Sequence, residues 1–126
     1  MNKKQKNQLI WVAAVVGIII LVGALVYKNN RPGELDDFAQ CLEQNGAVFY
    51  GAFWCPHCQE QKAMFGNSER LLPYVECSTP SGQGTTVVCQ KENITSYPTW
   101  VFKDGTRLSG VQTITVLSEK TGCQTL

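Results

Sequence analysis

The stretch GAFWCPHC, residues 51–58, places two cysteines three positions apart at the end of an apolar run. Residues 47–54 are apolar and β-prone, and residues 59–65 have the composition of a helix. A Cys-x-x-Cys pair at a strand-to-helix junction is the arrangement used for thiol–disulfide exchange. Because the free N–H groups of a helix N-terminus favour negative charge, we expect Cys55 to be the attacking thiolate. Cys58, one turn into the helix, is expected to be the more buried, resolving thiol.

The two residues between the cysteines are expected to support this chemistry. Pro56 falls at the first helical position, where its missing N–H costs nothing and its fixed φ suits a helix. His57 is the single histidine of the chain. If it is protonated, it adds positive charge beside the Cys55 sulfur and makes a disulfide there a stronger oxidant. The alternative for His57 is a solvent-exposed spacer.

An uncharged run near the N-terminus predicts a membrane anchor. Residues 9–27 read LIWVAAVVGIIILVGALVY and contain no charged side chain. Nineteen residues of helix are about enough to cross a hydrocarbon core of ~30 Å. The competing interpretation is a cleaved signal peptide, whose apolar region is usually about 7 to 15 residues and is followed by a small-x-small site. The longer run and the polar residues after it favour an uncleaved anchor.

The distribution of charge predicts the topology. Residues 1–8 carry three lysines, whereas Lys28 and Arg31 follow the apolar run. The positive-inside bias therefore predicts a cytoplasmic N-terminus and an exported remainder, in the periplasm or at the cell exterior. Beyond Arg31 the chain has six basic and ten acidic residues and no basic cluster, which argues against a nucleic-acid partner.

The expected organisation is a basic N-terminus (1–8), an anchor (9–27), a linker (28–33) and one domain (34–126). Hydrophobic periodicity and turn residues predict helices at 34–44, 59–65, 85–92 and 113–120, and strands at 47–54, 71–77, 99–103 and 106–111. The uniformly apolar strand 47–54 is expected to be central and covered on both faces, and Asp104-Gly105 predicts a hairpin. The order of elements predicts an α/β fold with a mixed sheet and flanking helices.

The six cysteines indicate an oxidising compartment, since the predicted topology exports all of them. If Cys55 and Cys58 cycle, three pairings remain for the other four. Cys77 and Cys89 bracket the loop at residues 78–84, and a disulfide between them would stabilise the fold by roughly 2 to 3 kcal/mol in the chain-entropy model. That pairing would leave the other two, which are Cys41 and Cys123. The alternative is that all four are buried free thiols that pack as small apolar residues.

Tyr97-Pro98, directly before a predicted strand, has two interpretations. It can be an ordinary start of an edge strand. A cis peptide bond placed against the CxxC would instead leave backbone groups free to pair with a substrate segment. Trp54 is either an apolar rim for substrate or a core residue. Glu43 and Glu76 are the acidic candidates for taking the Cys58 proton, and no sequence feature singles either out.

Three motifs carry a resemblance to a known family. They are YGAFWCPHCQEQKAMFG (50–66), YVEC (74–77) and SYPTWVFKDGTRLSG (96–110). Together they resemble the thioredoxin superfamily, and more closely the thioredoxin-like domain fused to bacterial and plant homologues of vitamin K epoxide reductase. The resemblance covers roughly residues 38–122.

The resemblance implies a thioredoxin-like fold with Cys55 as nucleophile, Cys58 as resolving thiol and Pro98 as a cis-proline. It also implies a structural Cys77–Cys89 bridge and a role in disulfide formation outside the cytoplasm. Trp54, Pro56, Tyr97 and Pro98 are then the expected substrate contacts. In that family the membrane reductase domain passes oxidising equivalents from a quinone to the thioredoxin-like domain. This sequence contains one predicted span, so the implied partner is a separate membrane enzyme.

The preferred hypothesis is an anchored thiol–disulfide oxidoreductase, without a bound cofactor, that oxidises exported proteins. One alternative is a reductase or isomerase kept reduced by a membrane electron donor. Another is a copper-binding or copper-delivery module that uses Cys55, Cys58 and His57, since soft thiolates suit Cu(I). Only two methionines are present to assist copper, and no second Cys or His pair completes a zinc site, so no metal is expected. A purely structural disulfide domain is the remaining alternative.

Overall fold

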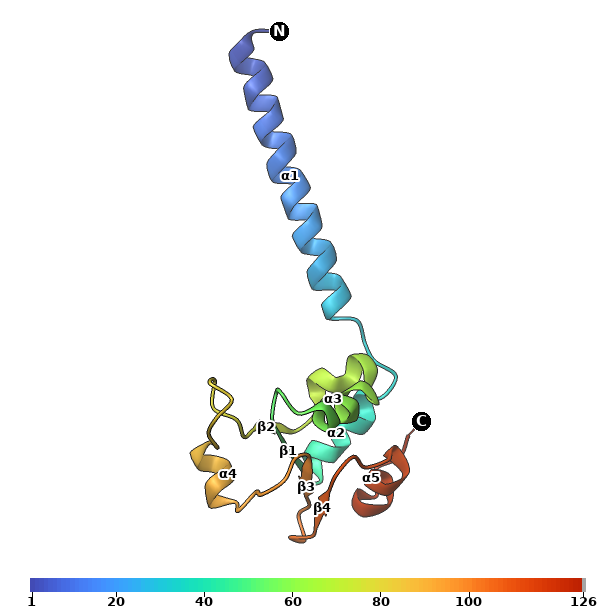
Figure 1. The fold of residues 1–126 in the computed structure, drawn as a ribbon. Helices are drawn as coiled ribbons and strands as arrows, with labels where there is room; N and C mark the ends of the chain where they lie inside the picture. The colour runs from blue at the N-terminus through green and yellow to red at the C-terminus, as the bar shows by residue number, and fades with distance from the viewer. Residues whose placement is uncertain (126) are drawn as a thin grey trace. The chain divides into compact units, whose positions relative to one another are not determined.

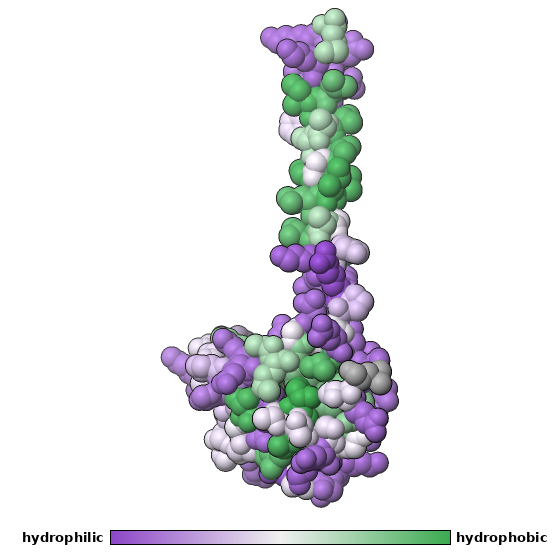
Figure 2. All heavy atoms as spheres, turned by 90° about the vertical axis from the view of Figure 1, so that its right-hand side faces the viewer, coloured by the Kyte–Doolittle hydropathy of each residue, from purple (hydrophilic) through white to green (hydrophobic). Residues whose placement is uncertain are grey.

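A computed structural model describes residues 1–125 and divides the chain into two compact units, residues 1–31 and residues 32 onward. Residue 126, the last of the predicted domain 34–126, lies outside the described residues. The first unit is helix α1 (Lys3–Asn29), all of whose residues are exposed. The mean hydropathy of an 18-residue window within it is 3.0, and its length and composition would allow it to cross a membrane. Figure 2 shows an apolar band along this helix with polar residues at both ends.

The second unit is built on a four-stranded sheet in the order β2-β1-β3-β4 (Figure 1). The strands are β1 (Val48–Gly51), β2 (Tyr74–Glu76), β3 (Thr99–Val101) and β4 (Arg107–Ser109). β1 pairs parallel with β2 and antiparallel with β3, and β3 pairs antiparallel with β4. The sheet is therefore mixed and β1 is an inner strand, which confirms the predicted fold class.

Helices flank this sheet, and they lie close to the predicted positions (Figure 1). They are α2 (Asp36–Gln44), α3 (Pro56–Ala63), α4 (Val87–Lys91) and α5 (Ile114–Thr121). The 3-10 helix η1 (Gly66–Leu71) was not expected. It takes up the start of the predicted strand 71–77, and Pro73 cannot donate a hydrogen bond to a neighbouring strand. The observed strand β2 is therefore shorter than predicted.

The predicted hairpin joins β3 to β4 through Asp104-Gly105. Gly105 has a φ of +82°, a conformation that glycine adopts without steric cost. The Asp104 carboxylate accepts a hydrogen bond of 2.8 Å from the Thr106 N–H, which closes the turn.

Large apolar side chains hold the central strand in place. Phe49 of β1 stacks on Trp100 of β3, with ring centroids 5.0 Å apart, and both are fully buried. Leu42 of α2 and Leu117 of α5 are also fully buried in this core. Burying such side chains contributes about 1.5 to 3 kcal/mol each. The strand whose end carries the CxxC is thus a firmly packed part of the fold.

Two disulfides tie later parts of the chain to the sheet region. Cys41 in α2 is bonded to Cys123, which follows α5, and their Cα atoms are 5.8 Å apart. Cys77, directly after β2, is bonded to Cys89 in α4, with a Cα separation of 5.5 Å. The Asn45 side-chain amide lies 3.2 Å from the Cys41 sulfur. Cys77–Cys89 is the pair favoured from the sequence, and Cys41–Cys123 is the pair that remains once it forms.

Candidate active site

The CxxC lies where β1 passes into α3. β1 ends at Gly51, Cys55 is the N-cap of α3, and Pro56 opens the helix. Both cysteines are free thiols, and both are largely covered: Cys55 is 6% exposed and Cys58 is 1% exposed. The junction therefore puts Cys55 at a helix N-terminus and Cys58 one turn further inside.

Cys58 sits in a tightly enclosed environment. Burial raises the pKa of the Cys58 thiol to about 12, and its hydrogen bond with Cys55 acts in the same direction. Gly51 lies directly against it, because a Cβ atom there would be 2.9 Å from the Cys58 sulfur and 2.8 Å from the Tyr74 ring. No side chain larger than hydrogen fits at residue 51 without moving these groups. Cys58 is thus a protonated, closely packed thiol.

Tyr74 and Lys62 lie near this thiol, and Glu76 is hydrogen-bonded to the tyrosine. The Tyr74 hydroxyl donates a 2.7 Å hydrogen bond to Glu76, while the Lys62 ammonium lies 3.6 Å from the centre of the Tyr74 ring. Burial and the neighbouring Glu76 carboxylate raise the pKa of Tyr74. Glu76 also accepts a hydrogen bond of 3.2 Å from the Phe53 N–H. It therefore links β2 to the loop that precedes Cys55.

Of the two acidic candidates, only Glu76 makes these contacts, because Glu43 lies exposed on α2. The sequence did not single out Tyr74 or Lys62. The structure places Lys62 half-buried over an aromatic ring. The sequence did contain an indication that Lys62 lies near the active site. Lys62 follows Cys58 by four residues, and residues four apart lie on the same face of a helix.

An aromatic rim surrounds the Cys55 side of the pair. Trp54 is 50% exposed, and its indole N–H donates a 2.9 Å hydrogen bond to the Ser78 hydroxyl. Its ring meets the Tyr97 ring edge-to-face, with centroids 6.0 Å apart. The Tyr97–Pro98 bond is cis, and the Cys55 sulfur lies 3.7 Å from the Tyr97 carbonyl oxygen. The structure thus brings Trp54, Cys55, Tyr97 and Pro98 together.

His57 lies apart from this group. Its side chain is 71% exposed, and its Nδ1 atom is 3.3 Å from the Glu60 carboxylate. Among residues 1–125, the structure shows no hydrogen bond between His57 and either sulfur. Any influence of His57 on Cys55 would therefore be electrostatic.

A buried glutamine fixes the active-site helix to the sheet. The Gln61 oxygen accepts hydrogen bonds from the Trp100 indole N–H, at 3.1 Å, and from the Gln112 N–H, at 2.7 Å. Its amide group donates a 3.0 Å hydrogen bond to the Gln112 carbonyl. Gln61 is fully buried and was not predicted as a site residue. Gln61 is spaced three and four residues from Cys58 and Phe65, which places it on the buried face of this segment. This spacing could have identified it from the sequence.

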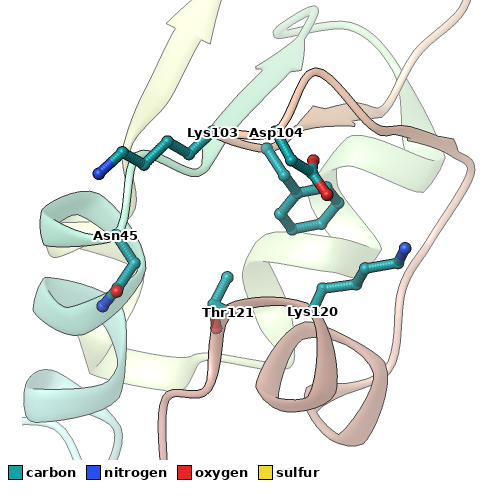
Figure 3. Close-up of a pocket in the computed structure, with 6 residues that line it drawn as sticks. Asn45, Lys103, Asp104, Lys120 and Thr121 are labelled. Atoms are coloured by element: carbon teal, nitrogen blue, oxygen red, sulfur yellow. The ribbon is translucent and has the colours of Figure 1, made fainter.

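A separate hollow of about 310 Å³ contains none of these residues. It is lined by Asn45, Phe102, Lys103, Asp104, Lys120 and Thr121. Figure 3 shows the Lys103 and Lys120 side chains pointing in different directions, so the hollow does not present converging cations. Over residues 1–125, no three His, Cys, Asp or Glu side chains form a cluster suited to a metal ion.

Comparison with known protein families gives no match. Among curated proteins, the chain is similar to the thiol-disulfide oxidoreductase LTO1 of Arabidopsis thaliana, with 45% identity over 89 residues. The matched region is 67% of this chain and 23% of the relative. The chain thus spans about a quarter of the length of the curated relative. The similarity to a thiol-disulfide oxidoreductase agrees with the redox chemistry that the cysteine pair supports.

Proposed function

We propose that the protein is a membrane-anchored thiol–disulfide oxidoreductase that donates disulfides to exported proteins. The observation that carries the proposal is the pairing of unlike thiols at the start of α3. Cys55 lies beside an exposed aromatic rim and the Pro98 loop, whereas Cys58 is enclosed and protonated. Because the two sulfurs differ in this way, a substrate thiolate can attack Cys55 while Cys58 is the leaving group. Cys58 later bonds to Cys55 again when the disulfide is re-formed.

The proposed reaction begins with the Cys55–Cys58 disulfide. A substrate thiolate attacks the Cys55 sulfur, forms a mixed disulfide and expels Cys58, which takes up a proton because its pKa is raised. A second substrate thiolate then attacks the substrate sulfur of the mixed disulfide and releases Cys55. The substrate dithiol loses two electrons and two protons, and the CxxC is reduced to the dithiol.

We further propose that a membrane enzyme of the vitamin K epoxide reductase type restores the disulfide with oxidising equivalents from a quinone. The quoted sequence motifs support this partner. The long apolar helix α1 and the distribution of lysines support an anchored domain outside the cytoplasm.

The division of roles is tested by trapping. Cys58→Ser should accumulate mixed disulfides between Cys55 and substrates, because the Cys55 thiolate can still open a substrate disulfide, releasing one substrate thiolate, and no Cys58 thiol remains to attack the mixed disulfide. Cys55→Ser should accumulate none. Both variants are assayed by non-reducing electrophoresis after acid quench and alkylation. Equal trapping by both variants, or by neither, contradicts the assignment.

The direction of electron flow is tested separately, because the same geometry also serves a reductase or isomerase. A reduction potential near −120 mV marks a strong oxidant and one near −270 mV a reductant. The proposal expects a value toward the oxidising end and a mostly oxidised Cys55–Cys58 pair in cells, read by alkylation shift. A mostly reduced pair would indicate that electrons flow from this protein to its substrates, as in a reductase or isomerase. The assignment of thiol–disulfide exchange to Cys55 and Cys58 would still hold.

A further inference from the structure

The first residues of the second unit are fastened to η1. Gly33 is packed so closely that a Cβ atom there would lie 2.5 Å from the Ser68 backbone nitrogen. The Leu35 N–H donates a 3.0 Å hydrogen bond to the Ser68 hydroxyl, and Asp36 forms an ion pair with Arg70. From Gly33 onward the chain is therefore part of the folded unit and is not a free linker.

This attachment point lies at the far end of the active-site helix. Residues 32–35 and 63–67 jointly line one hollow of about 440 Å³, so the chain enters the unit beside the C-terminal end of α3. Cys55 caps the opposite, N-terminal end. Eight helical residues at about 1.5 Å each separate the two ends by about 12 Å. The sulfur pair is thus one short helix away from the point of attachment.

Little chain remains to act as a tether. The apolar run ends at Tyr27, and Lys28 and Asn29 still belong to α1. Only residues 30–32 lie between the helix and the packed Gly33. Fully extended, these three span about 11 Å, and the two helical residues add about 3 Å. The length of α3 and the width of the packed segment are added to these two distances. The sulfurs can therefore lie at most about 30 Å from the end of the apolar run, whatever the orientation of the unit.

We propose that, among partners fixed in the same membrane, this short tether lets the CxxC reach only those whose cysteines lie within about 30 Å of the membrane surface. The limit applies to a partner that is itself fixed to the bilayer, because a freely diffusing protein can bring its cysteines down to the CxxC. The inference rests on the proposed function and on α1 as the anchor. It follows because a tether that cannot span the distance gives an effective concentration near zero, whereas one that matches the distance gives a high one.

The test uses the full chain in phosphatidylcholine vesicles with a dithiol peptide displayed on the same outer surface. The peptide is lipid-anchored through an (EAAAK)-repeat spacer, which is semi-rigid at about 1.5 Å per residue. Spacers set the peptide at about 15 Å or about 60 Å. The variant carries 20 Gly/Ser residues between Asn30 and Arg31. The matched control carries the same insertion between Met1 and Asn2, where it does not lengthen the tether.

At about 15 Å, all three proteins should oxidise the peptide at rates within about threefold of one another. At about 60 Å, the native and control proteins should slow at least tenfold, and the tether insertion should restore most of the rate. Equal rates at both heights for the native tether would overturn the inference. A soluble dithiol peptide is the separate control for the chemistry: if none of the proteins oxidises it, the proposed function fails, and not the reach of the tether.

Discussion

Two sulfur atoms only one helical turn apart are surrounded by different groups. Cys55 borders the Tyr97 carbonyl and the aromatic rim, while Cys58 is pressed against Gly51 and Tyr74. Burial is the largest cause of the raised Cys58 pKa, and we expect it to persist when Cys55 is held in a mixed disulfide. The release of a bound partner by Cys58 therefore depends on removing a proton from a thiol that holds it strongly.

This dependence predicts a steep pH profile for resolution. Only the thiolate of Cys58 attacks, and its population rises about tenfold per pH unit until pH approaches the raised pKa of about 12. The rate at which Cys58 resolves a preformed Cys55 mixed disulfide should therefore keep rising from pH 7 to 10. A single-turnover stopped-flow measurement of peptide release gives this profile. A profile that bends near pH 8.5 to 9, as expected for a thiol of ordinary pKa, about 8.5, would contradict the raised pKa of Cys58.

The hydroxyl of Tyr74 is predicted to contribute to stability through Glu76. Tyr74→Phe removes the 2.7 Å hydrogen bond to the carboxylate and should lower the free energy of unfolding by about 1 to 2 kcal/mol. Tyr97→Phe is the matched control, because it keeps the ring beside Trp54 and should cost less than about 0.5 kcal/mol. Urea unfolding of the full chain in detergent measures both. Equal costs for the two variants would contradict the role of the Tyr74–Glu76 hydrogen bond.

Among the elements, α3 depends on one buried amide for its position. Gln61→Ala would leave the Trp100 indole N–H and the Gln112 N–H without their acceptor. Each unsatisfied donor costs about 1 to 3 kcal/mol, so the loss of unfolding free energy should be about 2 to 6 kcal/mol. Gln59→Ala, in the same helix, removes one exposed hydrogen bond to Phe53 and should cost less than about 1 kcal/mol. Urea titrations compare them, and a Gln61→Ala cost as small as that of Gln59→Ala would refute the anchoring role.

The elements themselves could be predicted because their signals are local. The apolar run 47–54 predicted an inner strand, which is observed over the shorter range Val48–Gly51, and Asp104-Gly105 predicted the observed hairpin. The helix η1 was missed because Gly66 indicates a helix stop and does not reveal a second, tighter helix after it. The partners of Gln61 lie 39 and 51 residues away in the chain. Such contacts are set by the packing of the sheet, and no pattern within a short window reports them.

At the scale of the whole molecule, the two disulfides close loops of very different length. Cys41–Cys123 joins residues 82 positions apart, whereas Cys77–Cys89 joins residues 12 apart. In the chain-entropy model, the first should stabilise the fold by about 4.5 kcal/mol and the second by about 3 kcal/mol. The long bridge connects α2 to the end of the described chain and therefore encloses the sheet and the CxxC helix.

The prediction is that replacing both Cys41 and Cys123 by Ala lowers the unfolding free energy by about 1.5 kcal/mol more than replacing Cys77 and Cys89. Each double variant removes the same atoms, so the comparison isolates the closed loop from the chemistry of the substitution. Denaturant unfolding of the full chain in detergent, without reductant, measures the difference. The Cys77–Cys89 pair is the more deeply buried of the two, so packing around the sulfurs acts against the predicted order. A larger loss for the short bridge would therefore mean that packing, and not loop closure, sets the contribution of the disulfides to this fold.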